Sequence, residues 1–313
     1  MCLTGILVVK KPVCVRSTFC VKTVRNILGK KIKVGHGGTL DSTASGVLIL
    51  LIGQATRLSN FVMDMSKCYE VTVQLGSETS TDDESGDVSS EKKWNHVTDD
   101  LIDSALCGFL GWRMQTPPNI SAVHVNGERA HKLTRAGADI TILPKPVYFY
   151  KILRTSNLNS EGKVSFKIYC NRGTYIRSFA RDLGRIVGTV AHVYSLERTC
   201  IGMFKIENSV DFNEITEMKS AFELEQKVLP IQSIKGSYAS YTTDKAVFGA
   251  LSNGLSVAIS QVKRIQLPLQ TNTSKYATIF YSRSLSICSI VRDKGSFTLK
   301  PTVNIINAED IKQ

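Results

Sequence analysis

A glycine-rich loop followed by a short apolar run constrains this chain most strongly. The loop is Gly35-His36-Gly37-Gly38-Thr39-Leu40-Asp41-Ser42, and residues 47–52 form the apolar run. Three glycines around one histidine allow a sharp backbone path close to a ligand. A nucleotide P-loop is excluded, because Thr39 and Leu40 follow the last glycine where that motif needs Lys and Ser or Thr. The segment therefore predicts either a ligand-binding loop or a tight turn in which Asp41 caps the next element.

Strand-like and helix-like segments interleave along the first two thirds of the chain. Alternating apolar residues predict half-buried strands at 69–75 and 164–170. Helical spacing predicts a helix over residues 17–28, with Ser17 as its N-cap and Gly29 as its stop. This interleaving indicates an α+β fold, a mixed sheet with flanking helices.

The sequence changes character past about residue 240. Short β-rich pieces are separated by turn residues there, and nine Lys or Arg stand against four acidic residues, a net charge of +5. This predicts a small, basic, all-β module. A chain of 313 residues suggests two domains better than one, and we expect them at 1–235 and 240–313.

The charge balance of the whole chain favours a polyanionic partner. Lys and Arg number 39 and Asp and Glu 27, a formal net charge of +12, which favours nucleic acid before a membrane surface. A hydrophobic fraction of 42% excludes a largely disordered chain. The apolar run 47–52 is too short to cross a bilayer, and no Lys or Arg precedes the N-terminal apolar stretch. We therefore expect a cytoplasmic protein without a membrane partner.

The eight cysteines show no spacing typical of a bound metal. None forms a Cys-x-x-Cys pair, and no Cys/His cluster has zinc-ligand spacing. We expect all of them to be ordinary reduced residues, with neither a disulfide framework nor a metal site.

An acidic turn at residues 81–87 has some of the composition of a calcium loop. Placing Gly86 at loop position six puts Lys92 at position twelve, where a bidentate Glu is required. The turn is therefore expected to be a solvated hairpin tip.

Two basic clusters permit more than one interpretation. Arg177, Arg181 and Arg185 recur every four residues on one predicted helix, and Lys30, Lys31 and Lys33 precede the glycine-rich loop. Each cluster alone is either a solvated face or a set of groups that contact phosphates or hold a carboxylate. Taken together, they point to the backbone of RNA or DNA.

Several motifs occur in the order and spacing of one enzyme family. From residue 5 to about residue 215 they are Lys11-Pro12, Gly35-His36-Gly37-Gly38-Thr39-Leu40-Asp41, Ala44-x-Gly46-Val47-Leu48, Gly53-x-Ala55-Thr56-Arg57-Leu58, Lys67-x-Tyr69-x-Val71, Leu75-Gly76, Ser121-Ala122, Gly127, Gly173-Thr174-Tyr175-Ile176-Arg177, Leu196-x-Arg198-Thr199 and Gly202-x-Phe204. These motifs resemble the TruB family of tRNA pseudouridine synthases, which modify uridine 55 of the T-loop. The tail looks like a PUA-type RNA-binding domain, anchored on residues 249–254 and on Asp293-Lys294-Gly295 to Pro301.

The resemblance implies a reaction and a set of catalytic residues. A uridine inside a folded T-loop must be flipped out before an enzyme can reach it. Asp41 would be the catalytic aspartate at the glycosidic carbon, acting either as a nucleophile or by removing a ribose proton. Arg177 would pair with Asp41, and Tyr69 would stack on the flipped base and assist the final proton removal.

The remaining site residues implied by the resemblance line the substrate pocket. Tyr175 and Leu196 would contact the base, His36 would fill the space the base leaves, and Lys11 is expected to bind substrate. Rearrangement within one nucleotide is redox-neutral, so no cofactor and no metal is expected. The implied partner is the T-arm of tRNA, bound by a monomer that needs no obligate protein partner.

The sequence departs from the family pattern in places and leaves two alternatives open. Cys14 and Arg16 stand where the family has Gly and Thr or Ser, Ser42 stands where Pro is common, and His124 where Lys is common. One alternative is an RNA-binding or tRNA-folding protein with dispensable catalysis. The other is the relative that works with a guide RNA.

Overall fold

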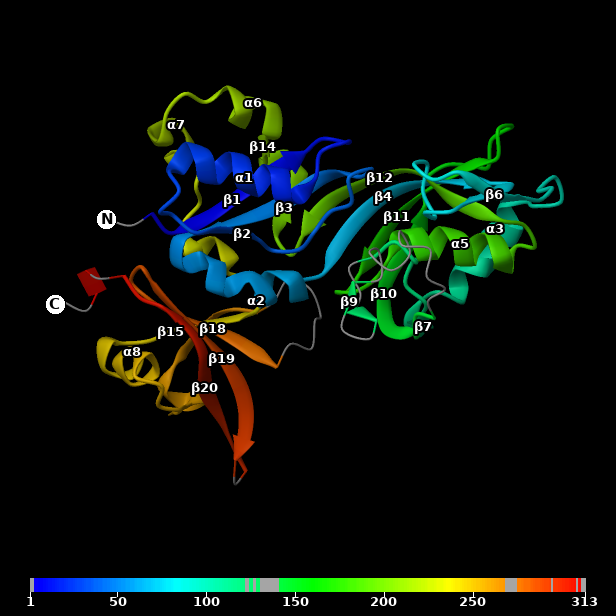
Figure 1. The fold of residues 1–313 in the computed structure, drawn as a ribbon. Coiled ribbons are helices and arrows are strands. Elements are labelled where there is room, and N and C mark those ends of the chain that lie inside the picture. The colour runs from blue at the N-terminus through cyan, green and yellow to red at the C-terminus, as the bar shows by residue number, and fades with distance from the viewer. Residues whose placement is uncertain are drawn as a thin grey trace.

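The computed structural model describes residues 3–121, 124–125, 128–129, 141–267, 275–293, 295–307 and 309–310. Within these residues the chain builds two large β-sheets, one from the first two thirds and one from the C-terminal part (Figure 1). The expected mixed α+β architecture with a β-rich C-terminal part is confirmed. None of the helices in the described part of the chain has the length and apolarity needed to cross a membrane.

The larger sheet contains ten strands among the described residues, in the order β14-β1-β3-β12-β4-β11-β10-β7, with β2 paired to β3 and β13 to β12. It is mixed, because β1 pairs with β14 and β12 with β3 in parallel while the other neighbours are antiparallel. Its strands are β1 (Gly5–Lys11), β2 (Val34–His36), β3 (Ser45–Ile52), β4 (Lys67–Leu75), β7 (Gly111–Gln115), β10 (Lys145–Arg154), β11 (Lys163–Cys170), β12 (Ala191–Ile201), β13 (Phe204–Lys205) and β14 (Val210–Asp211).

Strand β3 explains the uninterrupted apolar run of the sequence. Val47, Ile49 and Leu51 join one hydrophobic cluster, while the intervening side chains Leu48 and Leu50 join another on the opposite face. Successive strand residues point to opposite faces, so a strand covered on both sides has no polar position.

Helices cover both faces of this sheet (Figure 1). Helices α3 and α5 pack against strands β4, β10 and β11. Helix α1 packs against strands β1 and β3. The helices and 3-10 turns of this part are α1 (Ser17–Leu28), η1 (Gly53–Leu58), α2 (Ser59–Asp64), α3 (Asp99–Cys107), α5 (Ile176–Ile186), η2 (Ile206–Asn208), α6 (Phe212–Glu217), α7 (Ala221–Glu225) and η3 (Ile231–Ile234). Two short hairpins complete it, β5 (Ser77–Thr79) with β6 (Val88–Glu91) and β8 (His124–Val125) with β9 (Glu128–Arg129).

Helix α1 has the predicted bounds but not the predicted N-cap. Arg16 occupies the cap position without a side-chain hydrogen bond, and Ser17 already lies inside the helix. The Ser17 hydroxyl instead bonds the backbone of Leu40. The prediction of the cap was wrong because a partner far along the chain takes that hydroxyl. The predicted stop is confirmed, since Gly29 ends the helix with φ +92°.

The turn before α1 accounts for one departure from the family pattern. Cys14 adopts φ +63°, in the left-handed region that glycine reaches without steric cost. Its amide donates to the carbonyl of Ser42 at 2.7 Å, next to Asp41. A glycine at this position would therefore make the same turn without strain.

The C-terminal part is a second sheet with a helix, rather than an all-β module. Six described strands run in the order β16-β20-β19-β18-β15-β17. Their bounds are β15 (Ala239–Thr242), β16 (Val257–Ala258), β17 (Lys263–Gln266), β18 (Tyr276–Tyr281), β19 (Ser284–Asp293) and β20 (Ser296–Ile305). The short helix α8 (Lys245–Ser252) and η4 (Ile259–Gln261) accompany them. Sequence periodicity did not indicate α8, because it spans eight residues and buries only Phe248 and Leu251.

The two sheets share one hydrophobic cluster. Phe61 and Met65 pack with Tyr238, Phe280 and Leu285 from the C-terminal part. The buried Tyr238 hydroxyl donates to the Phe61 carbonyl at 2.5 Å. This contact fixes the C-terminal sheet against the segment that follows β3.

Candidate active site

Asp41 lies on the loop between β2 and β3, held there by a backbone that only glycine allows. Gly38 has φ +121°, and a Cβ on Gly37 would lie 2.2 Å from a methyl group of Val62. The glycines thus let the loop pass directly over α2. The Asp41 side chain remains 42% exposed, so it faces the space in which a substrate would bind.

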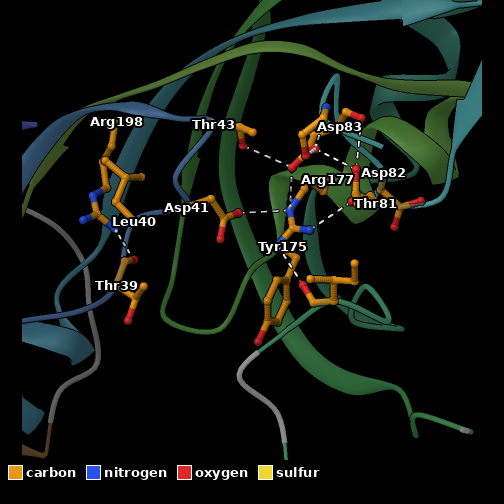
Figure 2. Close-up of polar contacts among 12 residues, drawn as sticks. Thr39, Leu40, Asp41, Thr43, Thr81, Asp82, Asp83, Tyr175, Arg177 and Arg198 are labelled. Carbon is orange, nitrogen blue, oxygen red and sulfur yellow. Dashed lines mark hydrogen bonds and ion pairs between the residues drawn. The ribbon is translucent and has the colours of Figure 1, made fainter. Parts of the chain in front are cut away.

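Asp41 forms an ion pair with a buried arginine of α5. The Nε atom of Arg177 lies 3.0 Å from Oδ2 of Asp41, and the Arg177 side chain is only 6% exposed (Figure 2). Sequence reasoning had paired these two residues only through the family resemblance, and the structure brings them together.

The guanidinium of Arg177 is fixed from behind by backbone carbonyls. Nη1 donates to the carbonyl of Thr81 at 2.9 Å, and Nη2 donates to the carbonyl of Ile120 at 3.1 Å. An arginine fork with two of its nitrogens bound in this way has one orientation, which presents the third nitrogen to Asp41.

A second carboxylate, that of Asp83, completes this network. Its Oδ2 lies 3.8 Å from Nε of Arg177, and it accepts hydrogen bonds from Thr43, Thr81 and Ser85. Burial alone would raise the pKa of Asp83, but the hydrogen bonds from Ser85 and Thr81, together with the charge of Arg177, hold it below its usual range. The Thr43 contact links this network to the loop of Asp41.

The acidic turn is therefore not the solvated hairpin tip that the sequence predicted. Asp82 and Asp83 are 8% and 5% exposed, and Asp82 forms an ion pair with Arg181 at 3.0 Å. The turn that carries these carboxylates and the helix that carries the arginines are far apart in the sequence, so the local pattern did not indicate the burial. Arg181 is buried, whereas Arg185 is exposed and forms an ion pair with Glu78 at 3.1 Å. All three arginines of the stripe therefore hold carboxylates, and only the third also meets solvent.

On its other side the loop of Asp41 is held by hydrogen bonds to its backbone (Figure 2). Arg198, which is 2% exposed, donates to the carbonyl of Thr39 at 3.1 Å and to that of Gly38 at 3.4 Å. Ser17 donates to the carbonyl of Leu40 at 2.8 Å and accepts from its amide at 2.9 Å. Sequence reasoning missed Ser17 and gave Arg198 no role, although Arg198 stands in one of the motifs.

Lys11 is not placed to contact a substrate, contrary to the expectation from sequence. It is fully buried, and its Nζ donates to the carbonyls of Pro12, Val15 and Ala44 at 2.6 to 2.8 Å. Burial lowers its pKa to about 8. Lys11 therefore joins the turn before α1 to the end of the Asp41 loop.

Tyr69 and Leu196 lie on the face of the sheet that Asp41 and α5 cover. Tyr69 pairs with Arg198 across β4 and β12, and Leu196 pairs with Val71. Both Tyr69 and Leu196 belong to the cluster under α5. Burial raises the pKa of Tyr69 to about 12, and the carboxylate of Asp41 contributes to the shift. The phenol is therefore protonated at neutral pH.

Tyr175 and His36 flank the same region. The backbone amide of Tyr175 donates to the side chain of the buried Gln115 at 2.9 Å, which fixes the start of α5. Burial raises the pKa of Tyr175, with the Asp41 charge as the next cause. Burial and then the charge of Arg198 lower the pKa of His36, whose ring accepts from the amide of Gly38 at 3.3 Å.

A basic and aromatic groove of about 760 Å³ lies between the large sheet and the C-terminal sheet. Its lining combines aromatic rings with three cations and the carboxylate of Asp64: Phe61, Trp112, Tyr148, Tyr150, Arg57, Arg172 and Lys275, with Tyr276 and Thr302 from the C-terminal strands. Arg172 precedes Tyr175 by three residues, which span at most about 11 Å. The groove therefore begins close to the site of Asp41.

The described residues hold no group of three His, Cys, Asp or Glu side chains arranged to bind a metal ion. Some residues singled out in the sequence lie outside the described part of the chain. These are Ala122 and Gly127 of the motifs, Lys294 of the C-terminal turn, and the side chain of His124.

Comparison with known proteins gives one consistent match. The model of the TruB family pseudouridylate synthase N-terminal domain matches residues 25–176. The tRNA pseudouridine synthase B of Prochlorococcus marinus is 40% identical over 211 residues, 67% of each chain. That of Dehalococcoides mccartyi is 35% identical over 297 residues, 95% of each chain.

Solved structures share the fold at lower identity. A Cbf5–Nop10–Gar1 complex contains a chain with a TM-score of 0.71 and 22% identity, covering 96% of this chain and 83% of that one. An H/ACA RNP bound to a substrate RNA containing 2'-deoxyuridine gives a TM-score of 0.70 and 19% identity, covering 98% and 86%. The similarity thus includes the C-terminal sheet.

Proposed function

Because the chain belongs to the TruB family of pseudouridylate synthases, we propose that it isomerises a uridine of tRNA to pseudouridine. The target is uridine 55 in the T-loop. The observation that carries the proposal is the half-exposed Asp41, whose carboxylate is oriented by the buried Arg177 at 3.0 Å. This is the arrangement that a single catalytic carboxylate needs, since its position is set before the substrate arrives.

The reaction breaks the N–C glycosidic bond and forms a C–C bond within one nucleotide. The uridine is flipped out of the T-loop so that its ribose meets Asp41. Asp41 acts at the glycosidic carbon, and the ion pair with Arg177 fixes its orientation. Once the N–C bond breaks, the base rotates and is rejoined through carbon. The reaction is complete when the proton on that carbon is removed.

The other site residues bind and position the base. Tyr69 stacks on the flipped uracil, while Tyr175 and Leu196 line the pocket. His36, whose lowered pKa keeps it neutral, fills the space that the base leaves. Lys11 has a positioning role, because all three of its hydrogen-bond partners are backbone carbonyls.

The C-terminal part and the groove supply RNA affinity. We assign 1–235 to the catalytic domain and 240–313 to a PUA-like RNA-binding domain. The three cations of the groove suit phosphates, and its aromatic rings suit unpaired bases. We also propose that the enzyme acts as a monomer in the cytoplasm and needs no obligate protein partner.

A guide-RNA-dependent enzyme and a tRNA-folding protein without catalysis are the competing functions. The relatives that are 35–40% identical are named tRNA pseudouridine synthase B, whereas the H/ACA proteins are 19–22% identical and share the fold. The ion pair of Asp41 with Arg177 is intact, which disfavours loss of catalysis.

The test is incubation of the purified protein with an unmodified tRNA transcript, followed by mapping of pseudouridine at single-nucleotide resolution. Wild type is expected to modify one T-loop uridine without guide RNA, and Asp41→Asn to leave it unmodified. The matched control is Asp87→Asn, which alters an exposed carboxylate of the β5–β6 hairpin and should keep full activity. Binding without modification would support the competing functions, and full activity of Asp41→Asn would refute the assigned role.

A further inference from the structure

Two cysteines that are far apart in the sequence face each other across the large sheet. Cys68 of β4 and Cys200 of β12 are register partners in adjacent antiparallel strands. Directly opposed residues in such strands have Cα atoms about 4.5–5.5 Å apart. A disulfide requires about 4.4–6.8 Å, so the register brings the two cysteines within its range, directly after a register shift between Arg198 and Cys200. Both cysteines are free thiols in the structure.

The surroundings of Cys68 favour its thiolate. A hydrogen bond from Cys200 is the largest influence on its pKa, and bonds from Thr199 and Tyr169 add to it. Burial opposes these contacts, but the net effect lowers the pKa of Cys68 to about 6 from an ordinary 9.0. A thiolate is the form of cysteine that reacts with oxidants.

The other buried cysteines have the opposite character. Burial raises the pKa of Cys20 and Cys288 to about 11, and that of Cys170 to about 12. These thiols stay protonated at neutral pH. Cys68 is 2% exposed, but its partner Cys200 is half-buried, so a small oxidant can reach the pair past Cys200.

We propose that Cys68 and Cys200 form a redox-active dithiol that hydrogen peroxide converts into a cross-strand disulfide. The Cys68 thiolate attacks one peroxide oxygen, the O–O bond breaks, and a sulfenic acid forms as hydroxide leaves. Cys200 gives up its proton and attacks the sulfenic sulfur, so that the S–S bond forms and the second oxygen leaves as water. In sum, two thiols and one peroxide give one disulfide and two waters.

The disulfide would join the two strands that carry Tyr69 and Leu196 without entering the site of Asp41. Successive strand residues point to opposite faces, so the Cys68 sulfur lies on the face away from Tyr69. A cross-link between distant parts of the chain restricts the unfolded state and raises thermal stability. This inference stands independently of the proposed function, because it concerns thiol chemistry that needs no RNA.

The test is peroxide titration of the full chain at pH 7, followed by blocking of the remaining thiols, proteolysis and mass spectrometry. We expect a peptide pair cross-linked through Cys68 and Cys200, with a rise in Tm that dithiothreitol reverses. Cys200→Ala is expected to abolish both, because it removes the second sulfur and also the hydrogen bond that favours the Cys68 thiolate. Cys107→Ser, which removes an exposed thiol, is the control and should change neither result.

The pH dependence of the oxidation provides a second measurement. Because the pKa of Cys68 is lowered, the rate of Cys68 oxidation should level off at a lower pH than that of an ordinary thiol. An ordinary thiol would continue to accelerate. Absence of the cross-linked peptide in wild type, or a rate that still rises steeply above pH 7.5, would overturn the proposal.

Discussion

The Nε atom of Arg177 lies 3.0 Å from Oδ2 of Asp41, on a guanidinium whose other two nitrogens are bound to the backbone carbonyls of Thr81 and Ile120. The arginine is buried and the aspartate is half-exposed. The rigid partner therefore comes from the protein core, and the carboxylate that it orients faces the substrate. Substitutions of the residues that maintain this arrangement should have measurable effects on the rate of turnover or on the free energy of unfolding.

Replacing Arg177 with lysine should reduce turnover strongly while leaving RNA binding nearly unchanged. Lysine keeps the charge but has no planar fork, so it cannot bind two carbonyls and Asp41 in one geometry. We expect single-turnover pseudouridine formation to fall about 100-fold, the cost typical of a misplaced catalytic group. Arg185→Lys, on the exposed side of the same helix, is the control and should retain the wild-type rate.

Asp83→Asn should lower stability at neutral pH and lose this effect in acid. The folded pKa of Asp83 is below its ordinary 3.8, so its charge stabilises the protein above that pH and the contribution disappears as pH falls through the folded pKa. We expect urea unfolding at pH 7 to show a loss of about 1–3 kcal/mol. The gap between the variant and wild type should narrow toward pH 3. A gap independent of pH would contradict the argument.

Ser17→Ala should loosen the Asp41 loop. The substitution removes both hydrogen bonds to the backbone of Leu40 and leaves that amide and carbonyl buried without their partner. We expect a loss of about 1–3 kcal/mol in the free energy of unfolding, together with slower turnover at unchanged RNA affinity. Thr18→Ala changes the exposed neighbouring residue in the same helix and should be neutral.

The buried Lys11 should make stability increase with pH in alkaline solution. Its folded pKa of about 8 lies below the ordinary 10.5, so the unfolded chain binds more protons between these values and unfolding becomes harder as pH rises. We expect the free energy of unfolding of wild type, measured relative to that of Lys11→Met, to increase from pH 8 to 10. The increase should be no more than about 1.4 kcal/mol per pH unit. The exposed Lys10, replaced in the same way, should show no such trend.

The groove between the two sheets should bind phosphates of the tRNA backbone. Neutralising Arg172 and Lys275 together, as Arg172→Gln with Lys275→Gln, should weaken tRNA binding. The slope of log K against log salt should become shallower by about 0.7–0.9 for each phosphate that the double variant no longer neutralises. Lys300→Gln removes an exposed charge of β20 outside the groove lining, and an equal effect there would refute a specific role.

Local patterns predicted the elements of the fold well where an element buries one face and exposes the other. Helix α1 and strand β4 appear close to the predicted bounds, because amphipathic spacing reports which face is buried. Helix α8 was not predicted, since two buried residues are too few to show a period. The predicted N-cap of α1 was wrong, because the Ser17 side chain bonds Leu40, which lies outside the helix.

The sequence by itself determined the family, the candidate catalytic aspartate and the order of strands and helices. These depend on residue identity and spacing along one stretch of chain. The tertiary structure alone decided that Asp83 is buried against Arg177, that Lys11 binds carbonyls rather than substrate, and that Cys68 meets Cys200. Burial and pairing between distant segments depend on which strands become neighbours in the sheet. The charge state and reactivity of a side chain follow from those neighbours, which no local pattern contains.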